Sequence, residues 1–100
     1  MLILLPPSET KTGRARGKAA GALALGVNSR RIGEMATGRP SFIASLGHMA
    51  GGGLIPVAGG VIIKGPDGLA IGAVGVTGDT SDNDEVAALA GIAAAGLTPL

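Results

Sequence analysis

Hydrophobic positions change period along the chain, and the change separates strands from helices. Met1 to Leu5 is a short apolar run of strand type, and two prolines close it. From Lys18 to Leu46 apolar residues recur three or four positions apart, which is typical of helices with one buried face. The period then becomes that of a strand, and it lengthens again after Thr80. The pattern predicts one strand, a group of helices, two strands and a final helix.

Glycine, proline and capping residues divide the helical region into three short helices. The first is rich in alanine, runs from Lys18 to Leu25 and ends at a glycine, which suits the left-handed end of a helix. Asn28 or Ser29 can cap a second helix. Pro40 suits the first turn of a third helix. The apolar face of this third helix consists of Phe42, Ile43 and Leu46.

The clearest unit of the sequence is a β-hairpin followed by a helix. Val61 to Ile63 and Leu69 to Val76 are strand-like, and Pro66-Asp67-Gly68 joins them with turn chemistry. Ser81, with Asp84 three residues later, gives a capping-box-like start to the last helix. The far side of that helix is nearly all small residues, so a sheet or a second subunit could approach it closely.

Composition limits the chain to one small domain. It has 100 residues and no cysteine, which excludes disulfides and zinc–cysteine sites. Phe42 is the single aromatic residue, so no surface for stacking nucleobases is expected and we predict no nucleic-acid partner. A core of Ala, Val, Ile and Leu in so short a chain is small, and self-association would add to its stability.

Charge is unevenly distributed although the net charge is only +1. Residues 1–40 hold seven of the eight Lys and Arg, and we interpret them as a solvated face. The stretch between Arg39 and Lys64 has no charge, but its glycines and prolines exclude a membrane span. Met1 to Leu5 lacks the charged flank of a signal peptide, so a cytoplasmic protein is expected.

Candidate chemistry centres on His48, the only histidine. It can serve as an axial ligand of a metal or haem, and Met49 beside it can serve as a soft ligand. Surface or capping roles for His48 and gap filling by Met49 are the alternatives. No set of nucleophile, base and orienting group is visible, so we do not expect an enzyme.

From about Lys18 to Pro99, blocks of residues match those of a known family: Lys18-Ala19, Ala22-Leu23, Gly38-Arg39-Pro40-Ser41-Phe42, Gly52 to Val57, Gly59-Gly60-Val61, Asp67-Gly68, Ile71 to Val76, Gly78-Asp79, Ser81, Asp84-Glu85 and Ala90-Gly91. Through these blocks the sequence resembles the GlcG/HbpS-type haem-binding family, which also forms the C-terminal domain of some cobalamin adenosyltransferases. The resemblance implies an α+β, profilin-like fold in which an antiparallel sheet is flanked by helices. It also implies a homo-oligomer that binds haem or a related tetrapyrrole.

A flat apolar ligand with two propionates suits walls of glycine and alanine with basic residues at the rim. Under this resemblance His48 is the candidate iron ligand with Met49 beside it. The candidate partners of the propionates are Arg30, Arg31 and Arg39.

Residues 1–17 depart from the family, and the resembling domain occupies residues 18–100. Family members usually begin with a helix and two strands ahead of the position of Lys18, so the resemblance implies a truncated version of the domain. Residues 1–11 instead resemble the start of the peroxide-stress proteins, which limit free iron and bind DNA. Because everything after them differs from those proteins, we transfer no DNA-related function. Leu2 to Leu5 is expected to act as a replacement strand beside the hairpin.

Two functions remain open from the sequence. The first is a non-enzymatic haem- or tetrapyrrole-binding module that acts as a homo-oligomer. The second is a structural or assembly domain that has lost its ligand site.

Overall fold

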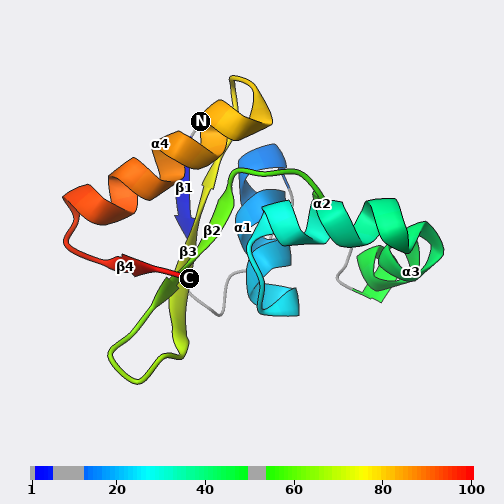
Figure 1. The fold of residues 1–100 in the computed structure, drawn as a ribbon, viewed down its shortest axis with the longest axis horizontal. Coiled ribbons are helices and arrows are strands. Elements are labelled where there is room, and N and C mark those ends of the chain that lie inside the picture. Colours follow the sequence, from blue (N-terminus) through cyan, green and yellow to red (C-terminus); the bar gives the residue numbers. More distant parts are fainter. Residues whose placement is uncertain (1, 6–12, 50–53) are drawn as a thin grey trace.

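The computed structural model describes residues 2–5, 13–49 and 54–100 of the chain. Four helices and four strands alternate in groups along these residues (Figure 1). In chain order the elements are β1 (Leu2–Leu5), α1 (Arg14–Leu25), α2 (Ser29–Gly38), α3 (Pro40–Met49), β2 (Gly60–Lys64), β3 (Ala70–Val76), α4 (Ser81–Ala94) and β4 (Thr98–Pro99).

The strands form one antiparallel sheet in the order β1-β3-β2-β4. β1 therefore lies against the hairpin, with Leu2 opposite Val76. That it replaces a strand of the family stays a prediction. Within the hairpin Ile63 pairs with Gly72 but Lys64 pairs with Ala70, so one extra residue interrupts β3. Such a bulge bends the hairpin and increases its twist.

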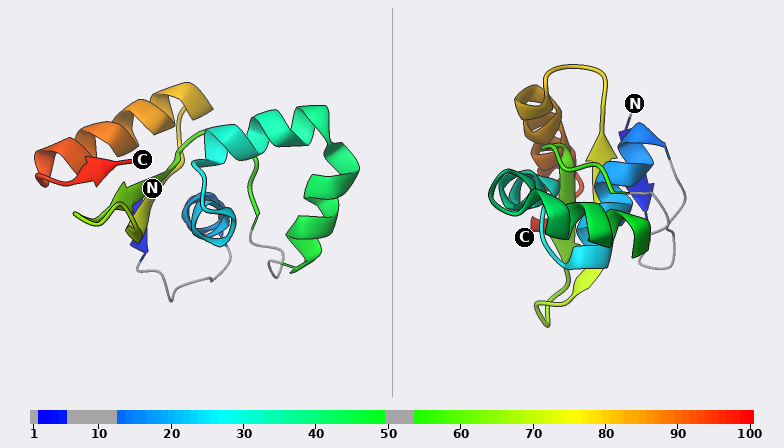
Figure 2. Two further views of the ribbon diagram at one scale, coloured as in Figure 1. Left: turned by 60° about the horizontal axis from the view of Figure 1, so that its bottom comes forward. Right: turned by 90° about the vertical axis from the view of Figure 1, so that its right-hand side faces the viewer.

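The two faces of the sheet carry different helices (Figure 2). Successive residues of a strand point to opposite faces. Ala73 accordingly packs with Ala19 and Ala20 of α1, whereas its neighbour Val74 packs on the side of α4. The cluster beneath α4 consists of Val61, Ile63, Val74, Ala88 and Ile92. The core is thus two thin layers of small side chains.

Glycines on the two central strands let α1 lie directly on the sheet. Gly60 and Gly75 are opposite one another across β2 and β3. A Cβ atom at Gly60 would lie 2.2 Å from the carbonyl oxygen of Lys18, and one at Gly75 would lie 2.0 Å from that of Ala15. No side chain fits at either position, because contacts between Cβ and backbone atoms this short do not occur.

The start of α2 covers the edge of β2 beyond β4. The amide of Ile62 donates to Asn28 Oδ1 at 2.8 Å, and the amide of Gly60 donates to Ser29 Oγ at 2.7 Å. Asn28 also donates to the carbonyl oxygen of Leu100 at 3.0 Å. Two side chains therefore make the hydrogen bonds to β2 that a neighbouring strand would otherwise make. From this anchor α2 and α3 extend away from the sheet (Figure 1).

The α+β, profilin-like arrangement expected from the sequence is confirmed. Two boundaries and one strand differ from the expectation. α1 begins at Arg14 rather than Lys18, and the N-cap of α4 is Thr80 rather than Ser81. The strand β4 was missed, because two residues carry too little pattern to be recognised. None of the helices in the described ranges is long and apolar enough to cross a membrane.

Candidate ligand-binding site

Helix α3 carries the candidate iron ligands in its last turn. His48 and Met49 lie at the end of this helix, and their side chains are outside the described part of the structure. Just before them, a Cβ atom at Gly47 would lie 3.9 Å from the side chain of Leu54. The chain after residue 53 thus returns past the end of α3. Leu54 and Leu46 are both half-buried there.

Arg39 lies at the other end of α3, at the corner between α2 and α3. Its amide donates to the carbonyl oxygen of Met35, and its own carbonyl oxygen accepts from Ile43. The centre of its guanidinium lies 4.3 Å from the centroid of the Phe42 ring, which is a cation–π contact. Phe42 is 40% exposed. The cation therefore lies over one face of the aromatic ring at the surface.

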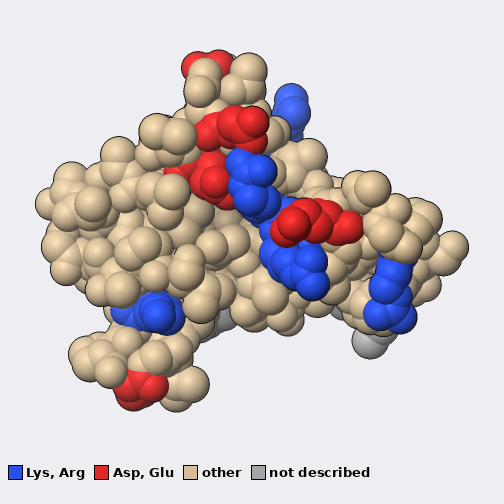
Figure 3. Space-filling view, in the orientation of Figure 1, with Lys and Arg blue, Asp and Glu red and all other residues tan. Residues whose placement is uncertain are grey.

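Arg30 is engaged in a network with α4. Its Nε lies 3.0 Å from both carboxylate oxygens of Glu85, and its Nη2 also contacts Asp82. Two hydrogen bonds raise the pKa of the Arg30 guanidinium above its ordinary value: the one to Asp82 has the larger effect, and the one to Glu85 follows. Lys and Arg alternate with Asp and Glu in the middle of the face where α2 meets the start of α4 (Figure 3). Arg30 is thus already neutralised by two carboxylates.

The three candidate arginines do not converge on one place. Arg30 and Arg31 lie in the first turn of α2, and Arg39 follows its last residue. Nine residues of helix separate Arg30 from Arg39 by roughly 13 Å along the axis. Among the described residues, neither Arg31 nor Arg39 has an ion-pair partner. Arg39 is the candidate nearest to the helix that carries His48.

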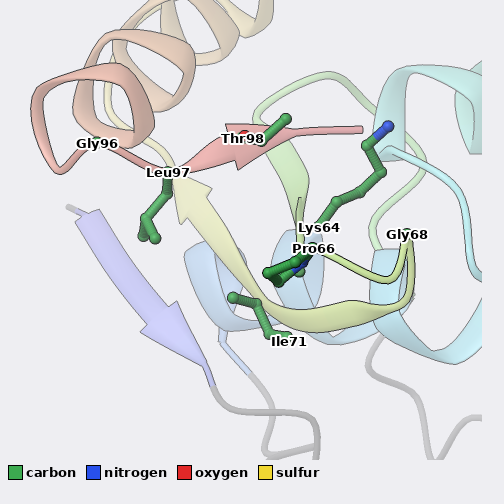
Figure 4. Close-up of a pocket in the computed structure, with 8 residues that line it drawn as sticks. Lys64, Pro66, Gly68, Ile71, Gly96, Leu97 and Thr98 are labelled. Carbon is green, nitrogen blue, oxygen red and sulfur yellow. The ribbon is translucent and has the colours of Figure 1, made fainter.

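Two open hollows lie on the described surface, and Arg30 lines one of them. One, of about 430 Å³, lies between the tip of the hairpin and the turn after α4, where Ile71 and Pro66 face Leu97 (Figure 4). Lys64 extends away from this space (Figure 4). The other, of about 320 Å³, lies between α2, Val57 and the start of α4. No histidine or methionine lines either hollow.

A buried ion pair joins α1 to α4 and was not predicted from the sequence. Lys18 Nζ donates to the carbonyl oxygen of Val76 at 2.9 Å and to Asp84 Oδ2 at 3.0 Å. The side chains of Lys18 and Asp84 are 2% and 3% exposed. A Cβ atom at Gly59 would lie 2.7 Å from the carbonyl oxygen of Val76 and 2.9 Å from Lys18 Nζ, and φ there is +125°, so a glycine is needed where the lysine passes. The only signal in the sequence is a single charge within an alanine and glycine stretch.

The ionisation of Asp84 reflects two opposing effects. Burial raises the pKa of its carboxyl group, because it penalises the charged form. Hydrogen bonds from Lys18 and from the amide of Asp79, together with the positive charge of Lys18, outweigh burial. The net effect is a pKa below the ordinary value for aspartate. The Asp84 carboxylate is therefore charged at neutral pH, and its contact with Lys18 joins α1 to α4.

The sequence and the fold were then compared with known proteins. Residues 9–93 match the family described as haem degrading protein HbpS-like. The chain belongs to this HbpS-like family. The match spans most of the chain and includes α1 to α3, the hairpin and nearly all of α4. No curated protein matches the sequence.

A solved structure with the fold of this HbpS-like chain is the crystal structure of a PduOC:heme complex. It superposes with a TM-score of 0.79 and 21% sequence identity, and the match covers 97% of this chain and 78% of the other. At this identity the likeness establishes the fold. About a fifth of the PduOC chain has no counterpart among these residues.

Haem needs an iron ligand, apolar contacts and cations near its propionates. His48 and Met49 have side chains of the right types for the iron, and the exposed ring of Phe42 lies beside the cation of Arg39. These donor types fit haem. Among the described residues there is no cluster of three or more His, Cys, Asp or Glu that could hold a bare metal ion.

Proposed function

We propose that this HbpS-like chain binds haem or a related tetrapyrrole without catalysing a reaction, and that it does so as a homo-oligomer. The observation that carries the proposal is the family match over residues 9–93. The shared fold with a protein solved as a heme complex supports it.

In this proposal α3 is the ligand-binding helix. His48 supplies an imidazole nitrogen to the iron, and Met49 supplies a thioether on the same turn. Arg39 pairs with a propionate, because its guanidinium is held at the surface over Phe42 and has no carboxylate partner among the described residues. Arg31 is a second candidate for a propionate. Arg30 can join only by leaving Asp82 and Glu85.

The chemistry of bound haem would come from its iron, and the chain would bind and orient the macrocycle. Apolar side chains near α3, such as Leu46 and Leu54, would exclude water from one face. The absence of a nucleophile, base and orienting group in the sequence supports a binding role over catalysis.

A haem titration of the purified protein tests the proposal. We expect a sharpened Soret band that saturates at one haem per chain. His48→Ala should weaken or abolish this band, because no other histidine is present to replace it. Met49→Ala should weaken the Soret band. Met35→Ala on α2 is the matched control and should leave the band unchanged.

Arg39→Gln should weaken haem binding more than Arg31→Gln if Arg39 holds a propionate. No change in the spectrum of haem at stoichiometric concentration would refute haem binding by this chain.

The family description also names haem degradation, and a separate experiment tests whether this chain degrades haem. Haem bound to the protein, kept in air with ascorbate as the reductant, should retain its Soret band if the chain only binds. Progressive loss of the band with release of iron would replace the non-enzymatic proposal with degradation.

A structural or assembly domain that has lost its ligand site is the second candidate function. One observation favours it: among the described residues, every buried side-chain nitrogen and oxygen has a hydrogen-bond partner, so none marks an unfilled polar site. In that case size-exclusion chromatography should show a stable oligomer that is indifferent to haem.

A further inference from the structure

The charges of α4 are confined to its beginning. Asp82, Asp84 and Glu85 lie in the first turns, and from Val86 to Leu100 the chain has no charged residue. A helix on the surface of a protein normally has polar residues on its outward side. Past its first turns α4 has no polar residue on any side.

The outward face of α4 is apolar and smooth. Asp84, Ala88 and Ile92 form its buried side. Val86 is 64% exposed and Leu89 is 38% exposed. The other outward residues of this surface, the α4 face, are small and exposed: Ala87, Ala90, Ala93 and Ala94.

Gly91 of α4 is not explained by the fold of a single chain. A Cβ atom there would meet no atom within 4 Å, and its φ is not positive. Glycine weakens the interior of a helix compared with alanine. Beside the α4 face, it keeps the helix narrow enough for another helix to approach.

The apolar surface continues past the end of α4. Leu97 is 40% exposed and lines the hollow that it shares with Ile71, which is 50% exposed. Figure 4 shows these two side chains directed toward the same space. Leu100 is also exposed. Exposed apolar side chains that adjoin one another mark interaction surfaces.

We propose that the α4 face binds the α4 face of a second copy of this chain, with the two helices antiparallel about a two-fold axis. The proposal deepens the self-association proposed above and rests on it. An uncharged face cannot recognise a charged partner, but it can pair with itself. In the antiparallel arrangement Asp82 and Glu85 of one copy lie far from those of the other, whereas a parallel arrangement would bring like charges together.

The area of contact indicates which residues must take part. The 14 residues of α4 make a rod roughly 21 Å long and about 10 Å wide. A stable interface usually buries about 800 Å² on each partner, which is more than one such rod provides. Exposed apolar residues that follow α4, such as Leu97 and Leu100, must therefore add to the contact.

Substitution at Ala90, in the middle of the α4 face, tests the proposal. Sedimentation velocity over a range of concentrations should show a dimer or larger assembly for the wild type. Ala90→Glu should weaken association by about tenfold or more, because the two-fold axis brings the two new carboxylates together in an apolar contact. Ala24→Glu, at an exposed alanine of α1, is the matched control and should associate like the wild type.

Mixing two variants makes the test specific to the two-fold axis. Ala90→Lys should also associate weakly alone, and an equimolar mixture of Ala90→Glu and Ala90→Lys should restore association. Circular dichroism of each variant checks that the fold is retained.

Two results would overturn the proposal. Association of Ala90→Glu equal to that of the wild type would refute the α4 face, and a monomeric wild type would refute self-association and leave this face for another occupant. The haem titration is independent of both results, so failure of haem binding is seen separately.

Discussion

At the scale of single residues, Lys18 has the largest structural role that the sequence did not reveal. It crosses from α1 past Gly59 to reach Asp84, 66 residues later in the chain. Local patterns contain no information on contacts of this range. The same reason explains Arg30, whose ion pairs with Asp82 and Glu85 were not predicted from the sequence. Its role toward haem stays a prediction.

Removing Lys18 should destabilise the protein strongly, because it leaves the carboxylate of Asp84 buried without its cation. We expect Lys18→Met to lower the melting temperature by more than about 10 °C. Lys64→Met removes the same charge from a partly exposed position and is the control, with a change near zero. Equal melting temperatures for the two variants would contradict the role of the pair.

The pH dependence of stability gives a second measurement of this pair. The folded pKa of Asp84 lies below its ordinary value of 3.8, so its contribution is present above that pH and is lost as the pH falls through the folded pKa. In Lys18→Met the contributions of Lys18 are gone and the hydrogen bond from the amide of Asp79 still opposes burial, so the folded pKa of Asp84 should lie above its wild-type value and less stability should be lost as the pH falls. Urea unfolding of both proteins between about pH 3 and pH 6 measures the two slopes.

At the scale of elements, most of the fold could be predicted from the sequence. The helix that starts at Pro40, the helix that ends before Gly26 and the hairpin around Gly68 were predicted because proline and glycine act locally. The first turn of α1 was not recognised, because arginine and glycine there interrupt the apolar period. The arrangement of the candidate site could not be predicted, since it depends on how α2 and α3 pack.

The start of α4 illustrates how far local patterns reach. Both Thr80 and Ser81 can cap a helix, and the sequence favoured Ser81 because Asp84 follows at the spacing of a capping box. In the structure Asp84 is committed to Lys18 and to the amide of Asp79, so Thr80 becomes the cap and accepts from the amide of Asn83.

Thr80→Ala should therefore cost about 1 kcal/mol of unfolding free energy, the usual value of an N-cap. Ser81→Ala should leave the unfolding free energy nearly unchanged, and chemical denaturation of both variants makes the comparison. A larger loss at Ser81 than at Thr80 would reverse the assignment.

At the scale of the whole molecule, the protein is thin: one helix on each face of a short sheet, with little side-chain volume between them. Because α1 lies so close to the sheet, small residues are enough to fill the space between them. The contact of backbone with backbone at Gly60 and Gly75 leaves no tolerance for added atoms.

Gly75→Ala should cost about 3 kcal/mol or more, because its Cβ atom would displace α1 from the sheet. Gly38→Ala makes the same chemical change in open space at the end of α2 and should leave stability equal or raise it by up to about 1 kcal/mol. Thermal unfolding of the two variants decides the matter, and similar stabilities would show that α1 can move away at little cost.

The side chains at the start of α2 have a consequence for solubility. Asn28 and Ser29 occupy the backbone groups of Ile62 and Gly60, which would otherwise offer a strand edge to another chain. Exposed edges of this kind are templates for aggregation. If α2 loosened while the sheet stayed intact, the newly exposed edge would recruit strands from other molecules. The first turn of α2 therefore protects the protein from aggregation and also anchors α2 and α3 to the sheet.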